Sequence, residues 1–224
     1  MQQGDDTWLA WRRRKVATFS GAANAIGVGH MSPRAYMKRR LGMVPEDPVN
    51  DMMRLGNALE AWTACMYNRL VHDNTAVFRY HATCELQFDD RFGGSVDRLV
   101  VDRHGNVVVL ELKVRASGAE RFEVPVEHCV QMLCYCAAYG VEKAHYFVYT
   151  PDKSFFAAEV TFAPNLWCIV YDRLVEFAMY HKRKELPPKM KRGERDSLCR
   201  TIMAHVFVNE IRELSQKVPV QQLQ

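Results

Sequence analysis

Residues 93–113 read GGSVDRLVVDRHGNVVVLELK, and this stretch decides the fold because it predicts a β-hairpin. The polar group from Asp102 to Asn106 separates two apolar runs and suits a three-residue loop with Gly105 in the left-handed conformation. Asp102 then faces Asn106 across the turn, which fixes the register of the two strands.

This register places Asp97 directly opposite Glu111, with Lys113 two residues further along the same face, because strand side chains alternate between faces. A two-residue loop would put the two carboxylates on opposite faces. Two facing carboxylates repel each other unless a cation lies between them, and such oxygen ligands suit Mg²⁺ or Mn²⁺. An ammonium beside the metal can hold or deprotonate an attacking water. The pattern therefore predicts a metal-dependent catalytic centre.

The alternative is a surface hairpin that carries a cross-strand pair of Glu111 and Lys113. Against it, residues 107–110 (VVVL) form an apolar run without alternation, which is typical of a strand buried on both faces. A charged Glu-x-Lys at the end of such a strand costs free energy, so the pattern favours a function.

Composition permits a nucleic-acid partner. The chain has 224 residues, 48% of them apolar, which suggests one domain with a sizeable core. Its formal net charge of +4 and pI of about 8.7 allow an acidic partner without requiring one. The basic residues are concentrated in short clusters at 12–15, 38–40, 182–184 and 189–200. Each cluster alone is equally compatible with a solvated helix end.

The seven cysteines lack paired zinc-ligand spacing, and we expect them to be reduced and mostly buried. Residues 1–6 are polar and acidic rather than a secretory signal, and no apolar run approaches the roughly 18 residues that span a bilayer. We therefore expect a soluble intracellular protein without a membrane partner, in the cytoplasm or the nucleus of the host cell.

Periodicity and capping residues predict the other elements. Helices are expected over 7–15, 21–26, 32–41, 50–70, 126–139, 165–183 and 201–214, and strands within 74–88 and over 144–149 and 155–162. Thr7 and Ser32 are the expected N-caps of the first and third helices, and the hydroxyls of Thr18 and Ser20 are expected to cap the second. Loops are expected at 45–48, 115–125 and 151–153.

The helix expected over 50–70 carries an apolar stripe with Glu60 at its edge. The stripe consists of Leu55, Leu59, Trp62 and Met66. Gly56 lowers helix propensity by about 1 kcal/mol relative to alanine, which suggests that something approaches closely there. Taken alone, Glu60 is more simply an ordinary helix-surface glutamate.

Four groups of residues then follow in order: WRRRKVATFS at 11–20, GNALE at 56–60, SVD at 95–97 with ELK at 111–113, and HCVQMLCY at 128–135. Together they resemble the PD-(D/E)xK nuclease superfamily, and within it the lambda-exonuclease or YqaJ-type viral recombinase nucleases, also called alkaline exonucleases. They match the R-x-G-x-(I/V)-T-A-S opening, the G-x-x-x-E helix, the catalytic core and the Q-(M/V)-x-x-Y helix. Val96 replaces the superfamily's proline, and Lys15 replaces the glycine of the opening, whose T-A-S is matched only loosely.

The resemblance covers roughly residues 8–188 and implies an α/β fold. Its core would be restriction-endonuclease-like, with a central mixed β-sheet flanked by α-helices. Residues 1–188 would form the nuclease domain, and residues 189–224 a basic C-terminal helical extension of the same domain.

By position, the resemblance assigns Asp97, Glu111 and the Leu112 carbonyl to two Mg²⁺ ions per site, with Mn²⁺ able to replace Mg²⁺. Glu60 would bind a metal or orient its water, and Lys113 would activate the nucleophilic water.

The remaining assignments concern the substrate. Gln131 and Tyr135, one turn apart on a helix, would flank the site, although ordinary helix packing explains them equally well. Arg13, Thr18 and Ser20 would hold the 5′-phosphate of the digested strand.

The implied activity is that of a magnesium-dependent deoxyribonuclease that degrades duplex DNA ends 5′ to 3′. Its product would be single strands for an annealing or recombination protein, and a ring-shaped trimer is expected by resemblance. The alternatives are an endonuclease, an RNA-cleaving host-shutoff nuclease on the same core, or a nucleic-acid-binding scaffold without activity.

Overall fold

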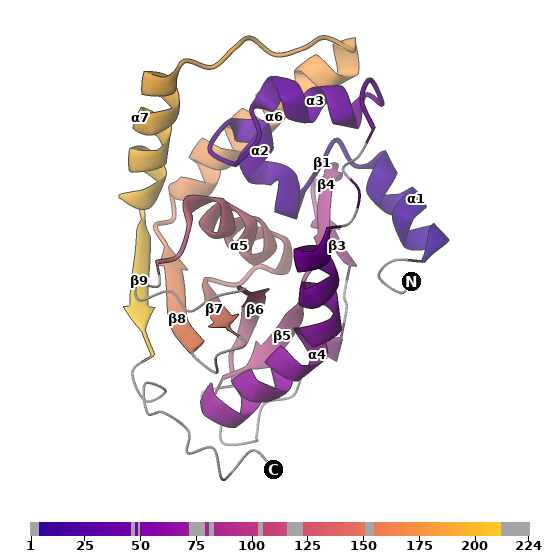
Figure 1. The fold of residues 1–224 in the computed structure, drawn as a ribbon. Coiled ribbons are helices and arrows are strands. Elements are labelled where there is room, and N and C mark those ends of the chain that lie inside the picture. Colours follow the sequence, from indigo (N-terminus) through magenta and orange to yellow (C-terminus); the bar gives the residue numbers. More distant parts are fainter. Residues whose placement is uncertain are drawn as a thin grey trace.

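The computed structural model describes residues 5–45, 48, 50–71, 79–80, 83–102, 105–115, 123–150 and 155–211. Its centre is a mixed sheet with the order β2-β5-β6-β7-β8-β9, covered by helices on both faces (Figure 1). The strands are β2 (Arg79–Tyr80), β5 (Arg98–Val101), β6 (Val107–Val114), β7 (Lys143–Tyr149), β8 (Phe155–Phe162) and β9 (Val206–Glu210). Strands β6 and β7 run parallel, and the other neighbours antiparallel. The predicted α/β class with a mixed sheet flanked by helices is confirmed.

A three-stranded sheet continues from the large one. Its order is β1 (Ala17–Thr18), β4 (Asp89–Ser95) and β3 (Thr83–Leu86), with β1 parallel to β4. Because β4 and β5 are separated only by Val96 and Asp97, the chain passes directly from one sheet into the other at Asp97.

The hairpin has the predicted register. Arg98 pairs with Leu110 and Val101 with Val107, and the Asp102 amide donates to the Asn106 carbonyl at 2.9 Å. Gly105 has a φ of +83°, as the three-residue loop requires.

Strand β6 is buried on both faces from Val108 to Leu110, as predicted. Val109 belongs to the larger core with α5, whereas Val108 and Leu110 belong to a smaller core with α4.

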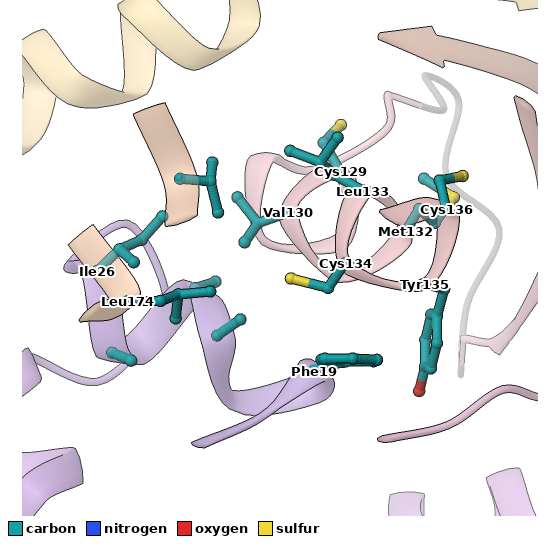
Figure 2. Close-up of a cluster of buried hydrophobic side chains, with 14 of the residues drawn as sticks. Phe19, Ile26, Cys129, Val130, Met132, Leu133, Cys134, Tyr135, Cys136 and Leu174 are labelled. Atoms are coloured by element: carbon teal, nitrogen blue, oxygen red, sulfur yellow. The ribbon is translucent and has the colours of Figure 1, made fainter. Parts of the chain in front are cut away.

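Helix α4 (Asp51–Val71) covers one face of the large sheet, and α5 (Val126–Tyr139) covers the other. Helices α2 (Ala22–Ile26) and α6 (Leu166–Arg183) pack outside α5. Figure 2 shows this larger core, in which Val130 and Cys134 of α5 form one buried cluster with Leu174 and Phe19. The remaining helices are α1 (Asp6–Arg14), the short 3₁₀ helix η1 (Phe19–Gly21), α3 (Pro33–Arg40) and α7 (Arg192–Met203).

The predicted apolar stripe of α4 is only partly correct. Met66 is buried, but the side chain of Trp62 is 40% exposed, and the buried face is formed by Thr63, Ala64 and Tyr67. The first half of α4 lines an open cleft instead of packing on the sheet, so its apolar residues lack a core to enter.

The predicted N-caps are partly confirmed. Ser32 caps α3 by accepting from the Ala35 amide at 3.2 Å. The cap of α1 is Asp5, which accepts from the Trp8 amide at 2.6 Å, so the prediction of Thr7 is wrong. A carboxylate also suits the positive end of a helix better than a hydroxyl does.

The helix predicted over 201–214 is wrong for most of its length. Helix α7 ends at Met203, and residues 206–210 form β9, which pairs antiparallel with β8. The apolar spacing fits either structure, and β8 offers a row of backbone groups that only a further strand can pair.

All seven cysteines are free, as predicted; Cys129, Cys134 and Cys136 are buried, whereas Cys65 and Cys168 are exposed. None of the described helices combines the length and the apolar character needed to cross a bilayer. Parts of the predicted loops at 45–48 and 115–125, the turn at 151–153, residues 74–78 and residues 212–214 lie outside the described residues.

Candidate active site

Asp97 occupies the junction between the two sheets, opposite the end of β6. Its Oδ2 accepts a hydrogen bond from the Leu112 amide at 2.8 Å, which fixes the carboxylate beside Glu111. Burial, and then the charge of Glu111, raises the pKa of Asp97 well above its usual value, although Lys113 and the Leu112 amide oppose this effect. The hairpin register therefore brings the two predicted carboxylates together.

Glu111 is fully buried, and its two oxygens have different surroundings. Lys113 donates to Oε1 at 2.5 Å. Oε2 is buried without a hydrogen-bond partner among the described residues. Burial lowers the pKa of Lys113, but the charges of Glu111 and Asp97 outweigh burial and raise it above its usual value. Lys113 is consequently an ammonium in this arrangement.

Glu60 approaches from α4. Its Oε1 accepts from Nη1 of the buried Arg98 at 2.8 Å, and the same nitrogen donates to the Asp97 carbonyl at 2.5 Å. Arg98 therefore links Glu60 to the backbone of Asp97, and Glu60 contributes to the raised pKa of that carboxyl. The single sequence gave no signal for Arg98 other than its position next to Asp97.

Gln131 and Tyr135 approach from α5, on the opposite face. The Tyr135 hydroxyl donates to the Ser95 carbonyl at 2.6 Å and is hydrogen-bonded to Gln131. Figure 2 shows the Tyr135 ring projecting away from the helix beside Phe19, whose ring it meets edge-on at 5.2 Å. The pair thus fixes the backbone two residues before Asp97.

His128 is a cleft residue that the sequence interpretation did not assign. Its Nδ1 lies 2.8 Å from the Tyr146 hydroxyl. Burial, followed by the charges of Lys113 and Arg115, lowers the pKa of His128 to about 3. Burial also raises the pKa of Tyr146 to about 12. A neutral imidazole and a phenol therefore share a hydrogen bond next to the Lys113 ammonium.

All the predicted metal and catalytic residues line one cleft of about 660 Å³. Its lining includes Glu60, Asp97, Glu111, Leu112, Lys113, Gln131 and Tyr135, together with Thr18 and Ser20. Arg12 of α1 lines the cleft, whereas the predicted Arg13 is exposed and does not.

The opening segment differs from its predicted local structure. Thr18 and Ser20 form no side-chain cap; Thr18 ends β1, and their hydroxyl oxygens lie 3.3 Å apart in the cleft. Gly56, for which a close approach was predicted, has open space among the described residues where a Cβ would lie, and it also lines the cleft.

Lys15, at the position of the family's glycine, is buried. Its ammonium pairs with Glu85 and donates to the Asp90 carbonyl at 2.6 Å. Trp11 of α1 donates to the same Glu85 oxygen at 2.6 Å, and Trp8 donates to the Ser95 hydroxyl at 2.7 Å. These bonds attach α1 to the small sheet and hold its cleft-lining face in place.

The site fits a divalent cation. A buried carboxylate oxygen without a partner is costly, and a cation between Asp97 and Glu111 would relieve both that cost and their repulsion. Among the described residues, no three His, Cys, Asp or Glu side chains form a metal-binding group. Two carboxylates with the Leu112 carbonyl match the way Mg²⁺ is commonly held, which leaves positions for water and phosphate.

Comparisons with known proteins show a similar fold and a family. A solved structure of the alkaline exonuclease LHK-Exo from Laribacter hongkongensis is similar with a TM-score of 0.64 and 18% identity, covering 89% of this chain and 99% of that one. The complex of LHK-Exo with dAMP gives a TM-score of 0.62 at the same identity and coverage. A search of curated proteins finds no match. The family model of the PD-(D/E)XK nuclease superfamily matches residues 31–196, which include every predicted metal and catalytic residue, and the chain therefore belongs to this superfamily of nucleases.

Proposed function

We propose that this nuclease is a magnesium-dependent exonuclease that digests double-stranded DNA from its ends in the 5′ to 3′ direction. Its single-stranded product would pass to an annealing or recombination protein. The observation that supports this most is the grouping of Asp97, Glu111 and Lys113 in one cleft, with a buried oxygen of Glu111 left for a cation. The similar fold of an alkaline exonuclease, and its binding of dAMP, a mononucleotide of the kind that end digestion releases, give further support.

Asp97, Glu111 and the Leu112 carbonyl would hold two Mg²⁺ ions, which Mn²⁺ can replace, and bound ions would supply Lewis-acid stabilisation of the phosphate. Lys113 carries a positive charge beside these carboxylates, where it can hold the attacking water and balance charge on the phosphate. Glu60 would orient a metal ligand through its fixed position on Arg98.

Gln131 and Tyr135 would flank the scissile phosphate and keep the Asp97 backbone in position. Thr18 and Ser20 would bind the terminal 5′-phosphate together with one arginine of α1. Arg12 has the favourable position in the cleft, and Arg13 is the residue that the family motif selects.

Linear duplexes with a 5′-phosphate, a 5′-hydroxyl or a blocked end test this proposal, alongside closed circular DNA and RNA, all with Mg²⁺. We expect mononucleotides from phosphorylated linear ends and no cleavage of circles. Cut circles would indicate an endonuclease, and cut RNA would indicate the RNA-cleaving alternative. Binding of DNA without cleavage of any substrate would indicate a scaffold.

Asp97→Asn tests the assignment of the site with little change in structure, because an asparagine oxygen can still accept the hydrogen bond that the Leu112 amide donates at 2.8 Å. Loss of the carboxylate should lower the cleavage rate by about 10³-fold, since metal-based stabilisation is worth several kcal/mol. Unchanged metal-dependent cleavage by this variant would overturn the assignment of the site. Light scattering would determine whether the active species is the ring-shaped trimer that the resemblance implies.

A further inference from the structure

Three of the described helices carry three basic residues each in their last turn. The C-terminal turns of α1, α3 and α6 contain Arg12, Arg13, Arg14; Lys38, Arg39, Arg40; and His181, Lys182, Arg183, respectively. A basic residue at a helix C-terminus is stabilised by the helix dipole, which explains each helix separately. It does not explain why three such ends meet at one place, because like charges repel.

Arg40 joins these ends. Its guanidinium donates to the Arg12 and Arg13 carbonyls, both at 3.1 Å, and to the carbonyls of Val16, at 3.2 Å, and Lys15. The last turn of α3 therefore caps the negative end of α1.

The end of α6 lies close to the same arginine. Burial, and then the charge of Arg40, lowers the pKa of His181 in the last turn of α6. Tyr36 of α3 stacks on Phe177 of α6, with ring centroids 5.7 Å apart. The C-terminal ends of α1, α3 and α6 accordingly occupy the same upper right part of the molecule in Figure 1.

Much of the charge at this place faces solvent. Arg13, Arg14, Lys38, Lys182 and Arg183 are exposed. Within the part of the chain that the structure describes, Lys38, Lys182 and Arg183 form no ion pair. These five residues form a positive surface, here called the helix-end surface.

The helix-end surface adjoins the active-site cleft in the last turn of α1. Arg12, in the same turn of α1 as Arg13, lines the cleft beside Trp8 and Trp11. A polyanion whose end enters the cleft along α1 would therefore leave it over the helix-end surface.

We propose that the helix-end surface binds the phosphate backbone of the duplex beyond the nucleotides that occupy the cleft. It holds the DNA while the end is digested, through contacts that do not depend on base sequence. This inference rests on the proposed action on duplex DNA, and it assigns the surface a role in affinity rather than in the chemical step.

The test compares two double variants that each remove two positive charges. Lys38→Gln/Arg183→Gln alters the helix-end surface, and Arg192→Gln/Arg200→Gln alters two exposed residues of α7, on the other side of the molecule in Figure 1. Binding to a duplex of about 30 base pairs is measured without divalent metal at several salt concentrations. The first variant should bind on the order of tenfold more weakly at low salt and reduce the slope of log K against log[salt] by about two.

The α7 variant should bind like the wild type. Equal behaviour of the two variants, or wild-type binding by the helix-end variant, would overturn the proposal, and the latter result would favour an acidic protein segment as the occupant. Equal melting temperatures of both variants and the wild type would show that folding is unaffected.

Cleavage separates this inference from the proposed function. With Mg²⁺, the helix-end variant should have a higher KM for the long duplex than the wild type, with an unchanged kcat. It should cleave a 5′-phosphorylated dinucleotide at the wild-type rate, because a dinucleotide is too short to extend from the cleft to the helix-end surface. If no protein cleaves DNA but the binding difference persists, the exonuclease proposal fails and the surface stands. If the wild type cleaves DNA and the variants bind alike, only the surface fails.

Discussion

Arg12 and Arg13 are neighbours in sequence, yet only Arg12 lines the cleft. Successive side chains on a helix point about 100° apart, so the motif position alone does not decide which arginine faces the substrate. Arg12→Gln should raise KM for 5′-phosphorylated ends by about tenfold or more relative to 5′-hydroxyl ends, because a charge-assisted hydrogen bond is worth about 1.5–3 kcal/mol. Arg13→Gln is the control and should leave this ratio unchanged. Steady-state kinetics measures this ratio. A changed ratio for Arg13→Gln and an unchanged ratio for Arg12→Gln would show that Arg13 binds the 5′-phosphate.

The neutral state of His128 has a measurable consequence for stability. Its folded pKa of about 3 lies below the ordinary value near 6.5, so the unfolded chain takes up the proton first as the pH falls. The contribution of His128 is therefore present above about pH 6.5 and is lost as the pH falls toward 3. Urea unfolding at several pH values should show a weaker pH dependence for His128→Gln than for the wild type. Parallel curves would contradict the neutral buried state.

At the same scale, the sequence predicted Asp97, Glu111 and Lys113 because their alternation and spacing are local properties of two strands. It did not predict Arg98 or Lys15 as structural partners. Arg98 bonds to Glu60, and Lys15 to Glu85 across 70 positions of the chain, so these pairs depend on how distant elements are placed.

Among the elements, the turn from β5 to β6 was predictable because glycine at φ +83° is required by the loop itself. Strand β9 was not predictable in this way, because its residues suit a helix or a strand and only the free edge of β8 decides between them. The prediction of a buried apolar stripe on α4 was partly wrong for a related reason, because the spacing of apolar residues does not show where the sheet beneath a helix ends.

The close packing of β4 against α5 depends on Gly94. A Cβ there would lie 2.9 Å from both Phe19 Cδ2 and Tyr135 Cε1. Gly94→Ala should therefore destabilise the fold by about 1–3 kcal/mol. The matched control is Gly56→Ala in α4, whose Cβ would meet no atom of the described residues within 4 Å and which should stabilise the fold by about 1 kcal/mol. Denaturant unfolding measures both, and a neutral Gly94→Ala would contradict the close packing.

For the whole molecule, the C-terminal region from Arg192 to Glu210 packs against the rest of the fold. Leu198 and Ile202 of α7 are buried in the larger core, and β9 completes the large sheet. Truncation after Ala204 should lower the melting temperature by about 5 °C or more and promote aggregation, because it exposes the edge of β8. A chain ending at Ile211, which keeps β9, is the control. Equal melting temperatures of the two would show that β9 adds no stability.

Glu111 Oε2, which has no hydrogen-bond partner among the described residues, also implies that this protein exchanges stability for activity at one position. Without metal, the carboxyl groups of Asp97 and Glu111 are buried beside a single ammonium, that of Lys113. This arrangement should destabilise the folded state. Asp97→Asn should then melt at a higher temperature than the metal-free wild type, although it cleaves DNA about 10³-fold more slowly. Mg²⁺ should raise the melting temperature of the wild type alone, so that the ion stabilises the folded state in addition to its role in cleavage.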